Sequence, residues 1–295
     1  MASIFKRNTP QRLKQIFQRP VVHDVNSVRA YRFPTYEITL MAHGECEDDL
    51  TKQFTGWIDS KLSPFGVEQA KRAGKIMAMD ESHFHVAYTS ELERAQATVK
   101  HVLEPLMVQP KVFATWRLND RHLGDLSGYN RSQMALVHGE RKIKEWSEEY
   151  SAMPPIIKVE NPQYKSIMDN MHKKHLTTDQ IPRAESVQMV YNRVLPYWEN
   201  IIVPSLKMRN KVIVIAHNTS LCALIRRFAE LSEMEAVHVS LPPAIPFTFT
   251  LDNHLKIIKG KNVKNSNKTR AQFVQSPQAA NANVTAATPS GVGTA

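Results

Sequence analysis

The chain has 295 residues, 42% of them hydrophobic, and a formal net charge of +10 at pH 7. This length can bury a large core, as one domain or as two small ones. The basic excess lies at the ends: residues 1–35 hold seven lysines and arginines against one acid, residues 254–295 hold six against none, and residues 36–253 are slightly acidic. The charge therefore does not indicate a nucleic-acid-binding or membrane-binding centre.

The two cysteines, Cys46 and Cys222, are too few for a disulfide scaffold and indicate a reducing compartment. No apolar run approaches the roughly 18 residues that are needed to span a bilayer. From these features we expect neither a membrane nor a nucleic-acid partner.

The two ends of the chain differ in composition from its centre. The first 20 residues contain lysine and arginine but no acid, which is typical of a mitochondrial transit peptide and equally of a disordered basic arm. We expect residues 1–35 to be a disordered extension of a cytoplasmic protein, with a mitochondrial location as the alternative. Residues 261–295 are dominated by small and polar residues and are expected to form a disordered tail.

The first regular element is a short apolar run, Tyr36–Met41, which predicts a buried parallel strand that ends at His43. A helix is expected to begin after it at Ser63, an N-cap residue, with Pro64 at its first position. The run Phe84–Thr89 predicts the next strand.

A second helix is expected to follow directly, because Ser90-Glu91-Leu92-Glu93 has the sequence of a capping box. Arg94 then falls in the first turn of this helix, at the same sheet edge as His43. The run Val112–Trp116 predicts a third strand, which leads into Asn119-Asp120-Arg121. This alternation predicts an α/β fold of three layers, in which a mostly parallel sheet is flanked by helices on both faces.

Residues 128–185 interrupt the alternation and are expected to form a lid-like insertion over the sheet edge, with a helix around Met134–Tyr150. A second buried strand, Lys211–Ala216, ends at His217 and lies between helices expected over 186–203 and 219–231. The last expected strand is Phe247–Leu251. The whole domain is expected to cover residues 36–260.

Two histidines at the ends of separate strands, His43 and His217, lie where open α/β sheets hold their sites. A histidine there can be a nucleophile, a general base, a metal ligand or a packed polar ring. Arg94 and the pair Asp120-Arg121 at the same edge favour a site for an anionic substrate, although each alone is compatible with an ordinary surface position. A metal site is a weaker interpretation, because no HxH or HExxH spacing accompanies His43, Glu45, Asp48 and Asp49.

These residues resemble the cofactor-dependent phosphoglycerate mutases of the histidine phosphatase superfamily. The resemblance runs collinearly over about residues 36–260. It rests on His43-Gly44-Glu45, Phe54-Thr55-Gly56-Trp57, Leu62-Ser63-Pro64, Thr89-Ser90, Arg94-Ala95, Thr115–Asn119, Arg121-His122, Trp146, Glu185-Ser186 and Ala216-His217.

The resemblance implies that His43 attacks a phosphoryl group and becomes a phosphohistidine, that His217 donates to the phosphoryl oxygens, and that Asp120 is the acid/base. It implies 3- and 2-phosphoglycerate as small phosphorylated substrates, 2,3-bisphosphoglycerate as the phosphoryl primer, no metal, and a homodimer. The implied substrate- or phosphate-binding residues are Arg94, Arg121, Arg131, Thr55, Gly56, Asp49, Asn218 and Thr219.

The sequence also departs from the family pattern. Ala42, Gln53, Ser147 and Glu148 occupy positions where the family has arginines. Asp120 replaces a glutamate, Asp49 an asparagine, Arg131 a lysine, and Asn218-Thr219 a glycine-asparagine pair. Three hypotheses follow: a phosphoglycerate mutase with an altered phosphate pocket, a phosphomonoesterase that uses the same histidine, and a weakened or inactive paralogue that acts by binding.

Overall fold

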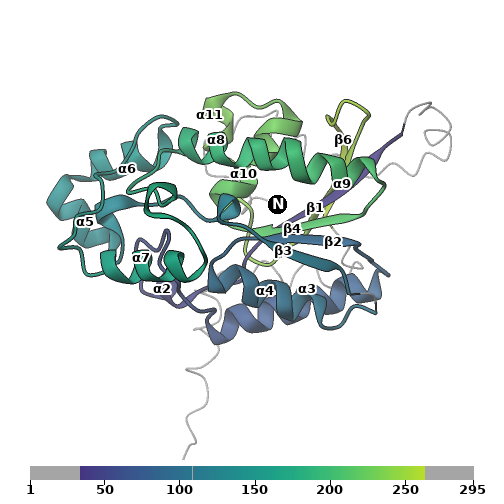
Figure 1. The fold of residues 1–295 in the computed structure, drawn as a ribbon, viewed down its shortest axis with the longest axis horizontal. Helices are drawn as coiled ribbons and strands as arrows, with labels where there is room; N and C mark the ends of the chain where they lie inside the picture. Colours follow the sequence, from purple (N-terminus) through teal and green to yellow (C-terminus); the bar gives the residue numbers. More distant parts are fainter. Residues whose placement is uncertain (1–33, 108, 263–295) are drawn as a thin grey trace, which may run out of the picture. The chain divides into compact units, whose positions relative to one another are not determined.

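The computed structural model describes residues 34–107 and 109–262. Their centre is a six-stranded sheet with the strand order β3-β2-β4-β1-β5-β6 (Figure 1). The strands are β1 (Tyr36–Ala42), β2 (Val86–Thr89), β3 (Lys111–Ala114), β4 (Val212–Ala216), β5 (Phe247–Leu251) and β6 (Ile257–Asn262).

The four strands β1 to β4 are parallel, whereas β5 and β6 are antiparallel to their neighbours. In the register of the central pair, Ala42 lies opposite Ala216. The residues after them, His43 and His217, therefore leave the sheet side by side. The prediction of a mostly parallel sheet is confirmed, and the additional antiparallel edge strand β6 was not predicted.

Helices cover both faces of the sheet, which confirms the three-layer arrangement (Figure 1). One face packs on α3 (Pro64–Met79) and α4 (Glu93–Leu103), and the other on α8 (Val187–Tyr197) and α10 (Asn218–Ala229). Side chains in β1 and β4 alternate between the two cores, as period-2 strands require. The domain also contains α2 (Glu47–Leu50), the π-helical segment η6 (Trp198–Ile202), α9 (Val203–Lys207) and α11 (Glu233–Ala236). Three short 3₁₀ helices among the described residues are η3 (Trp116–Leu118), η4 (Gly124–Leu126) and η5 (Thr178–Gln180).

The expected insertion contains α5 (Arg131–His138), α6 (Glu140–Glu148) and α7 (Tyr164–Lys173). The prediction of one helix around Met134–Tyr150 is wrong, because Gly139 has a φ of 84° and separates α5 from α6. A small apolar cluster ties α7 to the main domain through Trp57 and Leu92.

The starts of two helices test the capping predictions. The side chain of Ser63 accepts a hydrogen bond from Gly66 N at 2.9 Å, which confirms it as the N-cap of α3. The predicted capping box at Ser90 is wrong: α4 begins at Glu93 with Leu92 as its N-cap. The backbone N–H of Glu93 instead donates to the carboxylate of Asp59, which leaves the Ser90 hydroxyl available for another contact.

The expected start of the tail at residue 261 is wrong, because Lys261 and Asn262 belong to β6 and the domain therefore extends beyond residue 260. The rest of the tail and residues 1–33 of the extension lie outside the described part of the chain. Within the described part, no helix is both long and apolar enough to cross a bilayer.

Candidate active site

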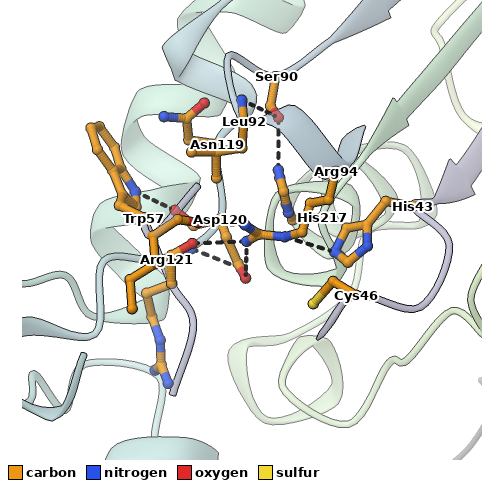
Figure 2. Close-up of polar contacts among 12 residues, drawn as sticks. His43, Cys46, Trp57, Ser90, Leu92, Arg94, Asn119, Asp120, Arg121 and His217 are labelled. Atoms are coloured by element: carbon orange, nitrogen blue, oxygen red, sulfur yellow. Dashed lines mark hydrogen bonds and ion pairs between the residues drawn. The ribbon is translucent and has the colours of Figure 1, made fainter. Parts of the chain in front are cut away.

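His43 follows β1 directly, and its two ring nitrogens have different partners. Nδ1 lies 2.6 Å from the carbonyl oxygen of Gly44, which can only accept, so Nδ1 carries the proton. Nε2 is therefore unprotonated, and it accepts a hydrogen bond from Nε of Arg94 at 3.3 Å (Figure 2). Burial, together with Arg94, lowers the pKa of His43 from 6.5 to about 4. At neutral pH the residue presents a neutral ring with a lone pair on Nε2.

Arg94 is the second residue of α4, and its side chain is only 1% exposed. NH1 donates to the carbonyl oxygen of Ile58 and NH2 to that of Gly56, each at 2.8 Å. NH2 also lies 3.5 Å from the carboxylate of Asp120. These contacts hold a buried positive charge beside the unprotonated nitrogen of His43, in a position suited to an anion.

His217 follows β4 and is the N-cap residue of α10. Its ring centroid is 4.9 Å from that of His43, with an angle of 60° between the planes. Nε2 lies 2.7 Å from Oγ of Ser90, whereas Nδ1 is buried without a hydrogen-bond partner among the described residues. Burial, followed by Arg94 and His43, lowers the pKa of His217 well below 6.5, so this ring is also neutral at pH 7.

Asp120 brings a carboxylate to the same group. Its Oδ1 accepts a hydrogen bond from the N–H of Arg121 at 2.8 Å, and Oδ2 faces Arg94 (Figure 2). Its backbone oxygen accepts from Nε1 of Trp57 at 2.6 Å and from NH2 of Arg193 at 2.7 Å. The structure thus brings His43, His217, Arg94 and Asp120 together, as the sequence predicted.

Two residues that support Asp120, namely Trp57 and Arg193, were not singled out as site residues from the sequence. Arg193 lies on α8 and is paired with the buried carboxylate of Glu185 at 2.6 Å. Arg193 also donates to the carbonyl oxygens of Arg117 and Asn119. The signal that could have found Arg193 is a charged residue within the apolar face of a helix, since buried charges are almost always paired.

The predicted binding residues Arg121 and Arg131 have other partners in the structure. Arg121 donates through NH1 to the carbonyl oxygen of Trp146 on α6 at 2.7 Å, and burial lowers its pKa. Arg131 is exposed, and its guanidinium lies 4.6 Å from the ring centroid of Phe54. The two guanidinium groups are close enough to influence each other electrostatically.

Thr55 and Gly56 lie in the loop that supplies the carbonyl contacts of Arg94, with Thr55 buried and Gly56 at a φ of 53°. Asp49 is turned toward the start of α2, where Oδ2 accepts from the N–H of Cys46 at 2.9 Å and lies 3.0 Å from its Sγ. Burial raises the pKa of the Cys46 thiol to about 12, so it remains protonated.

Asn218 and Thr219 form the first turn of α10, directly after His217. The side-chain oxygen of Asn218 accepts a hydrogen bond from the N–H of Leu241 at 2.7 Å and so anchors a neighbouring loop. Both residues are half-buried at the positive end of a helix dipole that adjoins the two histidines.

Comparison with known proteins identifies the arrangement. A family model described as the histidine phosphatase superfamily (branch 1) matches residues 38–163. A 2,3-bisphosphoglycerate-dependent phosphoglycerate mutase from Mannheimia succiniciproducens is 36% identical over 224 residues, which cover 75% of this chain and 97% of that protein. The chain belongs to this phosphoglycerate mutase family.

Solved structures share the fold at lower sequence identity. A mycobacterial glucosyl-3-phosphoglycerate phosphatase determined with VO3 has a TM-score of 0.55 and 20% identity, covering 72% of this chain and 92% of that chain. The α-ribazole phosphatase from Shigella flexneri has a TM-score of 0.55 and 20% identity, covering 74% and 91%.

Three departures from the family pattern lie in two different parts of the structure. Ala42 is 5% exposed and belongs to the core that α8 and α10 share with the sheet. Ser147 and Glu148 form the end of α6, where Oγ of Ser147 donates to the carbonyl oxygen of Ile143. They adjoin Trp146, whose carbonyl oxygen binds Arg121. This part of the site therefore has a hydroxyl and a carboxylate where the family pattern has two positive charges.

Within residues 34–107 and 109–262, no three histidine, cysteine, aspartate or glutamate side chains are grouped to hold a metal ion. For a phosphoryl compound the fit is better. The cation of Arg94 and the ring of His217 both lie next to His43, and two further cations, Arg121 and Arg131, are close enough to influence each other. Several positive charges near one nucleophile suit a compound with more than one anionic group, such as 2,3-bisphosphoglycerate.

Proposed function

We propose that this protein interconverts 3-phosphoglycerate and 2-phosphoglycerate in glycolysis through a phosphohistidine on His43. The observation that carries the proposal is the neutral His43 ring, whose unprotonated Nε2 lies beside the buried cation of Arg94. The 36% identity to a phosphoglycerate mutase over nearly its whole length supports the same choice of substrate. A glycolytic role would place the protein in the cytoplasm, with the mitochondrion as the alternative.

In each transfer to the protein, His43 Nε2 attacks the phosphorus of a phosphomonoester. A nitrogen–phosphorus bond forms while the phosphorus–oxygen bond to the glycerate breaks, and the leaving oxygen takes a proton. Asp120 carries that proton between the two transfers. Its carboxylate accepts the proton of a glycerate hydroxyl as that oxygen attacks the phosphohistidine, and the resulting carboxylic acid returns the proton to the oxygen that leaves.

During the transfer the phosphoryl oxygens carry negative charge. Hydrogen-bond donors and cations held in fixed positions stabilise that charge in the transition state. Arg94 is the nearest cation to His43, and its orientation is set by two carbonyl oxygens that do not depend on substrate. His217, whose ring centroid is 4.9 Å from that of His43, adds a neutral donor. Both groups lie next to His43 in the structure.

The first phosphoryl group has to come from outside the glycerate that is being isomerised. 2,3-Bisphosphoglycerate, when bound, supplies the phosphoryl group that loads His43. Arg94 and His217 would hold its reacting phosphoryl group, and Arg121 and Arg131 the remaining anionic groups.

A phosphomonoesterase is the second candidate, and one observation favours it. Ser147 and Glu148 reduce the positive charge beside Arg121, which weakens retention of a second anionic group. Water would then have access to the phosphohistidine, and inorganic phosphate would be released. The third candidate, a paralogue that binds without turnover, shares the fold but predicts no covalent phosphate.

Incubation with ³²P-labelled 2,3-bisphosphoglycerate tests these alternatives. The proposal expects an acid-labile, base-stable label on the wild-type protein and none on the matched His43→Asn variant. A coupled assay for conversion of 3- to 2-phosphoglycerate, with and without the bisphosphate, then identifies the reaction. Label with release of phosphate alone would show a phosphomonoesterase. No label at millimolar ligand on folded protein would contradict the mutase function.

A further inference from the structure

Ser90 lies between β2 and α4, outside the set of residues that the proposed reaction uses. Its side chain is 0% exposed, and its Oγ has two hydrogen-bond partners among the described residues. One is the backbone N–H of Leu92 at 3.2 Å, and the other is Nε2 of His217 at 2.7 Å (Figure 2). The contact with His217 joins residues that are 127 positions apart.

These two contacts determine the direction of the hydrogen bond. A hydroxyl carries one proton to donate, and it can accept through its oxygen. Leu92 N–H can only donate, so it occupies one of the two lone pairs of the Ser90 oxygen and leaves the Ser90 proton without a partner. The ring nitrogen of His217 is the one acceptor that the described residues place within reach of the Ser90 proton. Because a buried hydroxyl that fails to donate is unfavourable, Ser90 donates to Nε2.

A neutral imidazole has one proton, so a ring that accepts at Nε2 must carry its proton on Nδ1. Burial and Arg94 keep the pKa of His217 well below 6.5, so the ring has no second proton at neutral pH. Nδ1 is the nitrogen that lacks a partner among the described residues. Figure 2 shows the ring with Nε2 toward Ser90 and with Arg94 and His43 beyond it.

We propose that Ser90 is a positioning residue that fixes the proton of His217 on Nδ1, so that this nitrogen donates to a phosphoryl oxygen. The other tautomer would present a lone pair to the phosphoryl oxygens and repel them. His43 has the same Nδ1–H tautomer for a different reason, the carbonyl of Gly44, and there it leaves Nε2 free to attack. The two rings thus share one tautomer, but His43 presents the lone pair of Nε2 to the substrate and His217 presents the N–H of Nδ1.

The effect of Ser90 on phosphoryl transfer rests on the proposed function, whereas the tautomer of His217 can be measured without it. In full-length protein labelled with ¹⁵N-histidine, long-range proton–nitrogen correlation distinguishes a protonated ring nitrogen from an unprotonated one. The His217 signals are assigned by their loss in His217→Asn. We expect protonated Nδ1 and unprotonated Nε2 at pH 7 without any ligand. A wild-type ring protonated at Nε2 would overturn the proposal without any variant having to fold.

The second measurement compares Ser90→Ala with Thr89→Val. Thr89 is the adjacent residue, and its buried hydroxyl donates to the carbonyl oxygen of Ile215 at 2.8 Å. Only Ser90→Ala should lose the single His217 tautomer and slow phosphorylation of His43, by about tenfold or more. This loss is smaller than the roughly 10²- to 10³-fold effect of removing a transition-state donor outright, because part of the population keeps the correct tautomer.

Ser90→Thr retains the hydroxyl and should restore both the tautomer and the rate. Equal tautomers and equal rates in Ser90→Ala and Thr89→Val would contradict the proposal. If the wild type shows the expected tautomer but never forms a phosphohistidine, the proposed function fails, whereas the role of Ser90 in setting the tautomer is retained.

Discussion

Nε of Arg94 lies 3.3 Å from Nε2 of His43, and this contact joins the start of α4 to the end of β1 across 51 positions of the chain. The guanidinium donates to the nitrogen that is proposed to attack phosphorus. Its charge also opposes protonation of the ring and adds to the effect of burial on the pKa of His43. One arginine therefore both keeps the nucleophile neutral and provides the adjacent cation for a phosphoryl group.

Replacement of Arg94 by lysine is expected to slow phosphorylation of His43 by about 10²- to 10³-fold. A single ammonium cannot reproduce the planar fork that contacts Gly56, Ile58 and His43 together. The matched control is Arg117→Lys, since Arg117 is an exposed residue outside this group. Rates follow from quenched-flow labelling, with urea unfolding to verify the fold. Equal rates in both variants would show that charge alone is sufficient at position 94.

Gly56→Ala is expected to lower activity through the same contact. Gly56 has a φ of 53°, and a Cβ there would lie 3.1 Å from the carbonyl oxygen of Arg121 and from the N–H of Leu123. The loop must shift, and the carbonyl that binds Arg94 shifts with it. The expected loss is about tenfold to hundredfold in kcat, which is the scale of a small displacement in an active site.

Gly139→Ala is the control for Gly56→Ala. Gly139 has a φ of 84°, but a Cβ there meets no atom within 4 Å. Both variants are expected to lose about 1–3 kcal/mol of unfolding free energy because of backbone strain. Only Gly56→Ala should also lose activity per folded molecule, measured after the folded fraction is determined by urea titration. Equal activity per folded molecule in the two variants would show that the geometry of the Gly56 loop does not affect catalysis.

His122 is expected to make stability depend on pH. It is buried, Nδ1 accepts from the N–H of Gly124 at 3.0 Å, and burial lowers its pKa from 6.5 to about 4. Below pH 6.5 the unfolded chain binds a proton that the folded protein excludes. The stabilisation is thus complete above pH 6.5 and decreases, by up to about 3 kcal/mol, as the pH falls to about 4.

The variant His122→Asn tests this pH dependence. The side-chain oxygen of asparagine can accept from Gly124 but does not titrate, so the slope of unfolding free energy between pH 6.5 and 4 should be smaller than in the wild type. His43 and His217 affect the pH dependence of unfolding equally in both proteins, so their effects cancel when the two curves are subtracted. Parallel curves would show that His122 can be protonated in the folded state without loss of stability.

Loss of the buried ion pair Arg193–Glu185 is expected to lower the free energy of unfolding more than loss of a surface ion pair with the same N···O distance. Its N···O distance is 2.6 Å with side chains 8% and 3% exposed, whereas Lys142–Glu145 has the same distance with side chains 53% and 29% exposed. Glu185→Gln should cost about 3–5 kcal/mol because it leaves a buried guanidinium without its counterion. Glu145→Gln should cost at most about 1 kcal/mol. Equal values from urea unfolding would contradict the role of burial.

Much of the fold was predictable because it depends on short-range patterns. The runs that became β1 and β4 are apolar, and His43 and His217 come directly after them. The Ser63-Pro64 start of α3 was also correct, since a cap depends on residues within one turn. The strand β6 was missed because its sequence, Ile257-Ile258-Lys259-Gly260, has neither alternation nor a sustained apolar run.

The capping box predicted at Ser90 was wrong because of a long-range contact of this residue. Its local sequence matches a capping box, but its hydroxyl faces His217 and the helix begins later. A local capping rule does not include a competing acceptor that tertiary packing brings within 2.7 Å. The support of Asp120 by Trp57 and Arg193 was missed for the same reason, because both donors come from elements distant in sequence.

The sequence by itself determined the layered α/β fold and the position of His43, Arg94, Asp120 and His217 at one edge of the sheet, because strand ends and helix starts follow largely from neighbouring residues. Only the tertiary structure decided which nitrogen of His217 carries the proton and which carbonyl oxygens orient Arg94. Those properties depend on hydrogen bonds between residues 36 to 127 positions apart, whose partners meet only after the sheet and its two helical layers have packed.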